Sequence, residues 1–176
     1  MVINLGPILP AMDGLETVPF TDLYANNERC LRRDLTSYPT STWMTAENLL
    51  NITTGAASHS VGLFQDELQG RFGSQFLGMH SSGHFAAGGD ASDFFSSTND
   101  PSFFLHHGMV DNVYWIWQAL HPDEAREIDG TLTIFNDPPS RDAVKEDPLE
   151  MLVLGETITI EDALDTMAGK FCYVYV

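Results

Sequence analysis

The order of apolar and polar residues along the chain predicts a mainly helical fold. Leu63, Phe64 and Leu68 fall on one face of a helix that Ser60 can begin and Gly70 can end. Similar signals predict helices at 45–52, in the first part of 79–95, at 100–120 and from 159 onward, and strands at 130–135 and 170–176. Glycine, proline, asparagine and aspartate interrupt 1–42, so we expect loops there.

The predicted helix 100–120 carries a polar stripe although it is apolar almost all round. Asp100 can cap it and Pro101 suits its first position. One stripe holds Phe103, His106, Val110, Val113 and Trp117, and another holds His107, Asp111, Tyr114 and Gln118. A buried polar stripe needs partners, and a metal ion is one. His107 is therefore the better ligand candidate, Asp111 could orient an imidazole, and His106 is interpreted as a hydrogen-bonded core histidine.

Two further histidines stand one helical turn apart in "HSSGH". His80 and His84 would share one face of a helix, although a solvated polar loop is the alternative interpretation. Together with His107 they would offer three neutral imidazoles, with no cysteine or carboxylate in the motif. Such a set suits copper or zinc.

The strongly negative net charge of the chain argues against two classes of binding partner. The 176 residues carry a net charge of −17, which argues against binding nucleic acid or an anionic membrane. The sequence lacks both a long apolar run that could span a membrane and the basic and apolar regions of a signal peptide. Cys30 and Cys172 could pair with each other or with partners elsewhere.

The stretch from His80 to Gln118 resembles the copper-B half of the tyrosinase, catechol oxidase and haemocyanin family. The family signature is met by Asp100, Pro101, Phe103, Phe104, His107 and Asp111. The resemblance implies that His107 is a copper ligand, with His80 and His84 as the other two. "NLGP", "NERCLRRDL", "GTLTIFNDPPSRDA" and "FCYVYV" are similar to the secreted fungal short-tyrosinase branch, and Tyr173 and Tyr175 match its Y-x-Y element.

The resemblance implies a partial tyrosinase-type helical bundle with long loops and a few short strands. Residues 1–176 would be the C-terminal, copper-B part of a catalytic domain whose copper-A half is absent, because only His59 stands upstream of "HSSGH" and His121 looks like a helix-end residue. One copper is expected, and a second would need the missing segment as a partner. The family oxidises phenols and catechols with O₂, which takes two copper ions. The resemblance to the secreted fungal short-tyrosinase branch implies that this protein is secreted.

The departures from the family leave several functions open. Ser81 stands where many members have asparagine, which leans toward catechol oxidation alone. Phe85 and Phe94 would wall the substrate pocket, or simply pack in the core. The alternatives are an inactive pseudo-enzyme that binds one copper or none, a haemocyanin-like oxygen carrier, and a mononuclear zinc hydrolase with Asp90 or Glu67 as its base.

Overall fold

The computed structural model describes residues 30–71, 73–168 and 171–176, so the expectation for residues 1–29 lies outside the described part. The described helices and strands are α1 (Tyr38–Trp43), α2 (Ala46–Thr53), α3 (Val61–Gln69), α4 (Gly78–Ala87), α5 (Ser102–Leu120), α6 (Ile160–Ala163), β1 (Pro148–Leu149) and β2 (Ile158–Thr159). Short 3₁₀ turns lie at Ala56–Ser58, Gly89–Ser92, Ser97–Asn99, Ile134–Asn136 and Leu152–Leu154. The two strands pair antiparallel. The prediction of a mainly α fold is confirmed.

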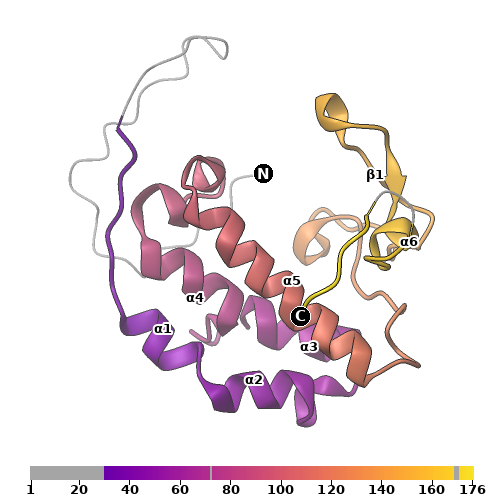
Figure 1. The fold of residues 1–176 in the computed structure, drawn as a ribbon, viewed down its shortest axis with the longest axis horizontal. Coiled ribbons are helices and arrows are strands. Elements are labelled where there is room, and N and C mark those ends of the chain that lie inside the picture. The colour runs from indigo at the N-terminus through magenta and orange to yellow at the C-terminus, as the bar shows by residue number, and fades with distance from the viewer. Residues whose placement is uncertain (1–29, 72, 169–170) are drawn as a thin grey trace.

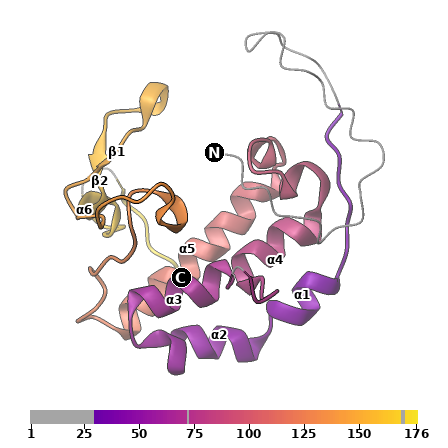
Figure 2. The ribbon, with the colours of Figure 1, turned by 180° about the vertical axis from the view of Figure 1, so that it is seen from behind.

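The helices α1 to α5 form one layered group, and the segments after α5 gather beside it (Figures 1 and 2). Helix α5 runs across α4 and α3, and α2 lies beneath them in Figure 1. No helix in the described part of the chain is long and apolar enough to cross a membrane.

Local capping signals located three helices correctly. The Thr45 hydroxyl accepts from the main-chain N–H of Asn48 at 3.2 Å, and the Ser60 hydroxyl accepts from that of Leu63 at 3.2 Å. Thr159 forms a capping box at the start of α6. Each side chain satisfies an N–H group that the first turn of a helix leaves without an intrahelical partner, which explains why these starts were readable from sequence.

Three sequence expectations were wrong. Residues 130–135 form one isolated bridge, between Thr131 and Asp142, and then a 3₁₀ turn instead of a strand. The tail 171–176 forms no strand in the structure. Leu63 does not share the buried face of Phe64, because its side chain is 49% exposed. A periodic pattern identifies an apolar face, but only the packing partners decide how much of it is covered.

The core lies between α2, α3 and α5. Its members are Ile52, Ala57, Val61, Phe64, Leu68, Met79, Val113 and Trp117. Trp117 is completely buried, and its indole N–H donates to the Ser58 carbonyl at 3.0 Å. Its ring lies 5.2 Å from that of Phe64. This cluster fixes the position of α5 and therefore of the polar stripe that α5 carries.

An extended segment, 30–37, ties the ends of α4 and α5 together. The main-chain N–H groups of Asp34 and Thr36 donate to carbonyls at the end of α4, at 3.0 and 2.9 Å. Gly88 has a φ of +62°, and a Cβ there would lie 2.5 Å from the Asp34 carbonyl oxygen. Glycine is therefore required where this segment passes. Arg33 donates two hydrogen bonds, each 2.7 Å long, to the carboxylate of buried Asp100 beside the start of α5.

Candidate metal centre

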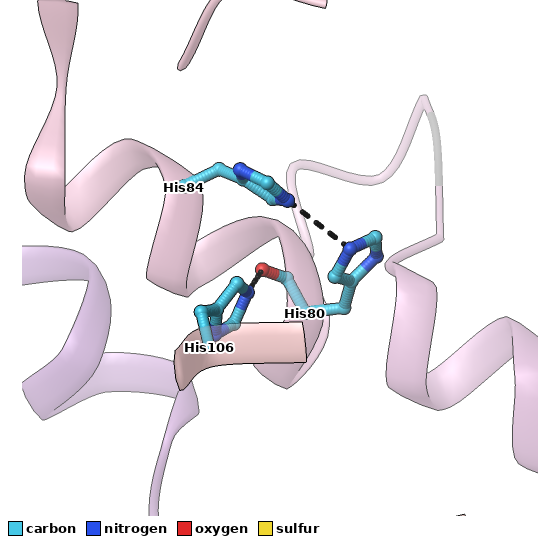
Figure 3. Close-up of side chains that lie close together, drawn as sticks. All are labelled: His80, His84 and His106. Atoms are coloured by element: carbon cyan, nitrogen blue, oxygen red, sulfur yellow. Dashed lines mark hydrogen bonds between the residues drawn. The ribbon is translucent and has the colours of Figure 1, made fainter. Parts of the chain in front are cut away.

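Three histidine side chains from α4 and α5 meet beside the core. The Nε2 atom of His84 lies 3.1 Å from Nε2 of His80 and 3.2 Å from Nε2 of His107. His80 and His84 project from α4 one turn apart, and Figure 3 shows their rings meeting at their Nε2 atoms. The structure thus brings together the three histidines that the sequence singled out.

Hydrogen bonds to the outer nitrogens fix which ring nitrogens carry protons. Nδ1 of His84 lies 2.8 Å from the Ala91 carbonyl oxygen, which can only accept, so Nδ1 carries the proton. Nδ1 of His80 lies 2.5 Å from Oε1 of Gln69, and with the amide in this orientation Nδ1 is the donor. A neutral ring protonated at Nδ1 presents a lone pair at Nε2. In the neutral form of both rings, the two lone pairs therefore face each other. That arrangement is repulsive unless a cation lies between them.

The spacing of these nitrogens fits a metal ion. Imidazole nitrogens that each bind at about 2.0–2.1 Å in a tetrahedral or trigonal site are about 3.3–3.6 Å apart. The observed separations of 3.1 and 3.2 Å are close to this range. An all-imidazole set suits copper or zinc.

His106 also lies in this cluster. Potential ligand nitrogens of His80, His84 and His106 lie within 4.8 Å of one another. However, Nε2 of His106 lies 2.7 Å from the main-chain carbonyl oxygen of His80, so this nitrogen donates a hydrogen bond (Figure 3). His107 is the better third member, because its Nε2 points at Nε2 of His84. His106 is hydrogen-bonded, as the sequence predicted, but it is only partly buried and is not a core residue.

The cluster favours neutral imidazoles. Burial, reinforced by the neighbouring histidines, lowers the pKa of His80 to about 3. Burial likewise lowers the pKa of His106 to about 4 and reduces the pKa of His107. Neutral rings keep the lone pairs that a metal requires.

Asp111 holds the C-terminal tail against α5. Its Oδ2 atom accepts from the hydroxyls of Tyr173 at 2.7 Å and Tyr175 at 2.5 Å. Burial and the Asp111 carboxylate raise the pKa of Tyr175 to about 12. The contacts described for Asp111 thus go to the two tyrosines, whereas the sequence suggested a contact with an imidazole.

The residues that the sequence suggested for a substrate pocket, Ser81, Phe85 and Phe94, do not line the pocket beside His107. A pocket of about 300 Å³ lies between α3 and α5, lined by Phe64, Gln65, Leu68, Gln69, His107, Val110, Asp111 and Tyr114. Ser81 donates from its hydroxyl to the Gln69 carbonyl at 2.6 Å. Phe85 is half-buried, and Phe94 is exposed at 59%. None of these three side chains is among the residues lining this pocket.

Sequence reasoning missed two residues at the cluster. Gln69, at the end of α3, contacts the outer nitrogen of His80, and no local signal marks it. Phe103 stacks on His107 with ring centroids 4.0 Å apart, a helical i, i+4 contact that the spacing alone could have suggested. The remaining histidines lie elsewhere: His59 is exposed, and Nε2 of His121 donates to the Thr53 carbonyl at 2.8 Å.

Most of the chain is similar in sequence to known proteins of one family. The family described as "Common central domain of tyrosinase" matches residues 2–120. The oxidase hkm6 of Aspergillus hancockii is 31% identical over 99% of the chain and 61% of its own length. N-acetyl-6-hydroxytryptophan oxidase of Emericella nidulans is 31% identical over 98% of the chain and 49% of its length. Tyrosinase P of Aspergillus terreus is 30% identical over 99% of the chain and 48% of its length.

A solved structure agrees with these matches. A variant of polyphenol oxidase from Thermothelomyces thermophila superposes with a TM-score of 0.77 at 30% identity, covering 85% of this chain and 42% of that one. The chain thus spans about half the length of the relatives it matches. The family match over residues 2–120 and the shared helical fold show that the chain belongs to the tyrosinase family.

Proposed function

We propose that His80, His84 and His107 bind one copper ion and serve as the copper-B site of a tyrosinase-type oxidoreductase. The observation that carries this proposal is the pair of facing Nε2 lone pairs, 3.1 Å apart, with both outer nitrogens held by acceptors. Membership of a copper-binding family selects copper over zinc.

The proposed reaction oxidises an o-diphenol with O₂ to an o-quinone and water. Bound copper would supply one-electron redox chemistry toward O₂ and the diphenol. The protein would hold His80 and His84 in the tautomer protonated at Nδ1 through Gln69 and Ala91. Phe103 would wall one side of His107. The pocket between α3 and α5 reaches His107 and is a route by which a small phenolic molecule could approach.

A two-copper site would need histidines that these residues do not supply. The chain has six histidines, of which four lie in the cluster described above. His59 is exposed, and His121 is hydrogen-bonded to α2. We therefore propose that the ligands of a second copper come from another polypeptide segment.

The same histidine count supports a second candidate, a protein that binds a single copper without oxidase activity.

A zinc hydrolase is disfavoured by the contacts of its two candidate general bases, Asp90 and Glu67. The Asp90 carboxylate accepts from the main-chain N–H of Arg32 at 3.1 Å, and Glu67 pairs with Arg71 at 3.1 Å. Both carboxylates are thus engaged by groups outside the cluster.

Metal analysis and oxygen uptake test these proposals together. We expect about one copper per purified chain, lost in His107→Ala and retained in His59→Ala, the matched control at an exposed histidine. Tight zinc binding with hydrolytic turnover would overturn the copper assignment. Oxygen uptake with 4-methylcatechol, assayed together with the segment that carries the second set of copper ligands, would support the oxidase. Copper binding without uptake under the same conditions would favour the inactive candidate.

A further inference from the structure

His106 lies against α4 at the level of the two α4 histidines. Its ring is stacked with that of His80, with centroids 5.5 Å apart and planes at 14°. It meets the ring of His84 edge-on, with centroids 4.9 Å apart and planes at 89°. Its ring also lies 5.5 Å from that of His107. The ring of His106 therefore contacts all three proposed ligands while its own Nε2 is directed elsewhere.

The hydrogen bond of His106 ends on the main chain of a proposed ligand. Its Nε2–H donates to the carbonyl oxygen of His80 at 2.7 Å (Figure 3). In a helix this carbonyl would otherwise accept only from the N–H one turn later, at His84. The bond from α5 therefore fixes the turn of α4 on which both His80 and His84 stand.

Gly83 provides the space that the His106 ring occupies. A Cβ at position 83 would lie 2.1 Å from Cε1 of His106 and 2.4 Å from its Nδ1. No side chain larger than hydrogen fits there unless the ring moves. The glycine in "HSSGH", which is costly inside a helix, thus has a packing reason.

We propose that His106, seated on Gly83, is a positioning residue that sets the orientation of His80 and His84 without binding the ion itself. This inference deepens the proposed copper site and rests on it in part. Nε2 of His106 carries a proton for the His80 carbonyl and so has no lone pair for a metal, and its Nδ1 faces Gly83 on α4. His106 thereby acts on the ligands through the main chain and through ring packing.

The first test needs no metal. Long-range ¹H–¹⁵N spectra of histidine rings distinguish protonation at Nδ1 from protonation at Nε2, and the His106→Gln variant identifies the His106 signals by their loss. We expect the metal-free chain to show His106 protonated at Nε2. Protonation at Nδ1 alone would overturn the proposal whether or not the chain binds copper.

The second test compares copper affinity among matched variants. His106→Leu removes the donor but keeps the bulk, and His106→Gln keeps an N–H at a similar reach. We expect His106→Leu to bind one copper with a Kd raised about 10–100-fold, and His106→Gln to stay close to the parent. Gly83→Ala should weaken binding similarly, and the double variant Gly83→Ala/His106→Leu should be no weaker than either single one, because both changes displace the same ring.

Three results would contradict this role. Complete loss of copper in His106→Leu, as in His107→Ala, would make His106 a ligand. An unchanged Kd, with an unchanged electron paramagnetic resonance spectrum of bound Cu(II), would reduce it to ordinary packing. Strict additivity in the double variant would show that Gly83 and His106 act separately. If the parent chain binds no copper, the proposed function fails, and the tautomer measurement alone decides the inference.

Discussion

The ion pair between Arg33 and Asp100 gives a stability prediction of definite size. Asp100 has no solvent exposure and receives four hydrogen bonds, two from Arg33 at 2.7 Å and two from Ser102 at 2.8 Å. Replacing Arg33 with leucine leaves a buried carboxylate without its counter-ion, a change that typically costs about 3–5 kcal/mol. Because the Arg33 side chain is 43% exposed, water would replace part of the contact. We expect the lower end, about 3 kcal/mol.

Urea unfolding at pH 7, followed by tryptophan fluorescence, measures this free energy. The matched control is the double variant Arg33→Leu/Asp100→Asn, in which no charge is left buried. We expect it to be less destabilised than the sum of its two single variants, because the single changes each break the same pair. A loss below about 1 kcal/mol in Arg33→Leu, or simple additivity, would refute the reasoning.

Acid provides an independent check on the same pair. The hydrogen bonds from Arg33 hold the pKa of Asp100 below its usual value. A lowered carboxyl pKa stabilises the folded state above the unfolded value of about 3.9, and this stabilisation is lost as the pH falls through the folded pKa. Arg33→Leu should therefore show a weaker loss of stability in acid than the parent. Equal acid sensitivity in both would contradict the assignment.

Further predictions concern the glycine turn, the histidine cluster and the tail. Gly88→Ala should lower the thermal unfolding midpoint, since its φ of +62° and the nearby Asp34 carbonyl oppose a Cβ, and an unchanged midpoint would count against this. Because the pKa of His80 is lowered to about 3, the metal-free fold should lose stability as the pH falls from about 6.5 toward 3, a slope that His80→Gln should reduce in circular dichroism unfolding curves. Tyr175→Phe removes a hydrogen bond to Asp111, so carboxypeptidase should cleave the tail faster. The free energy of unfolding should fall by about 1 kcal/mol. Equal cleavage rates in the variant and the parent would contradict the contact.

The sequence by itself determined the local elements and the chemistry they carry. Ser60 and Thr45 marked helix starts because a cap is a contact between residues two or three positions apart. The spacing of His80 and His84 placed both on one face of α4 because a helix repeats every 3.6 residues. The helical period also assigned His106 and His107 to different faces of α5. In the structure, Nε2 of His106 contacts the His80 carbonyl oxygen, whereas Nε2 of His107 faces Nε2 of His84.

Only the tertiary structure decided what these elements meet. Arg33 reaches Asp100 across 67 positions, and Tyr175 reaches Asp111 across 64, and neither pairing leaves a periodic trace in the sequence. The tail looked like a strand because its aromatic and β-branched residues favour one, but a strand forms only where a neighbouring strand offers a ladder of hydrogen bonds. The contact of Gln69 with His80 likewise depends on how α3 packs beside α4. Periodicity reports the face that a residue occupies, whereas its partner depends on long-range packing that brings distant segments together.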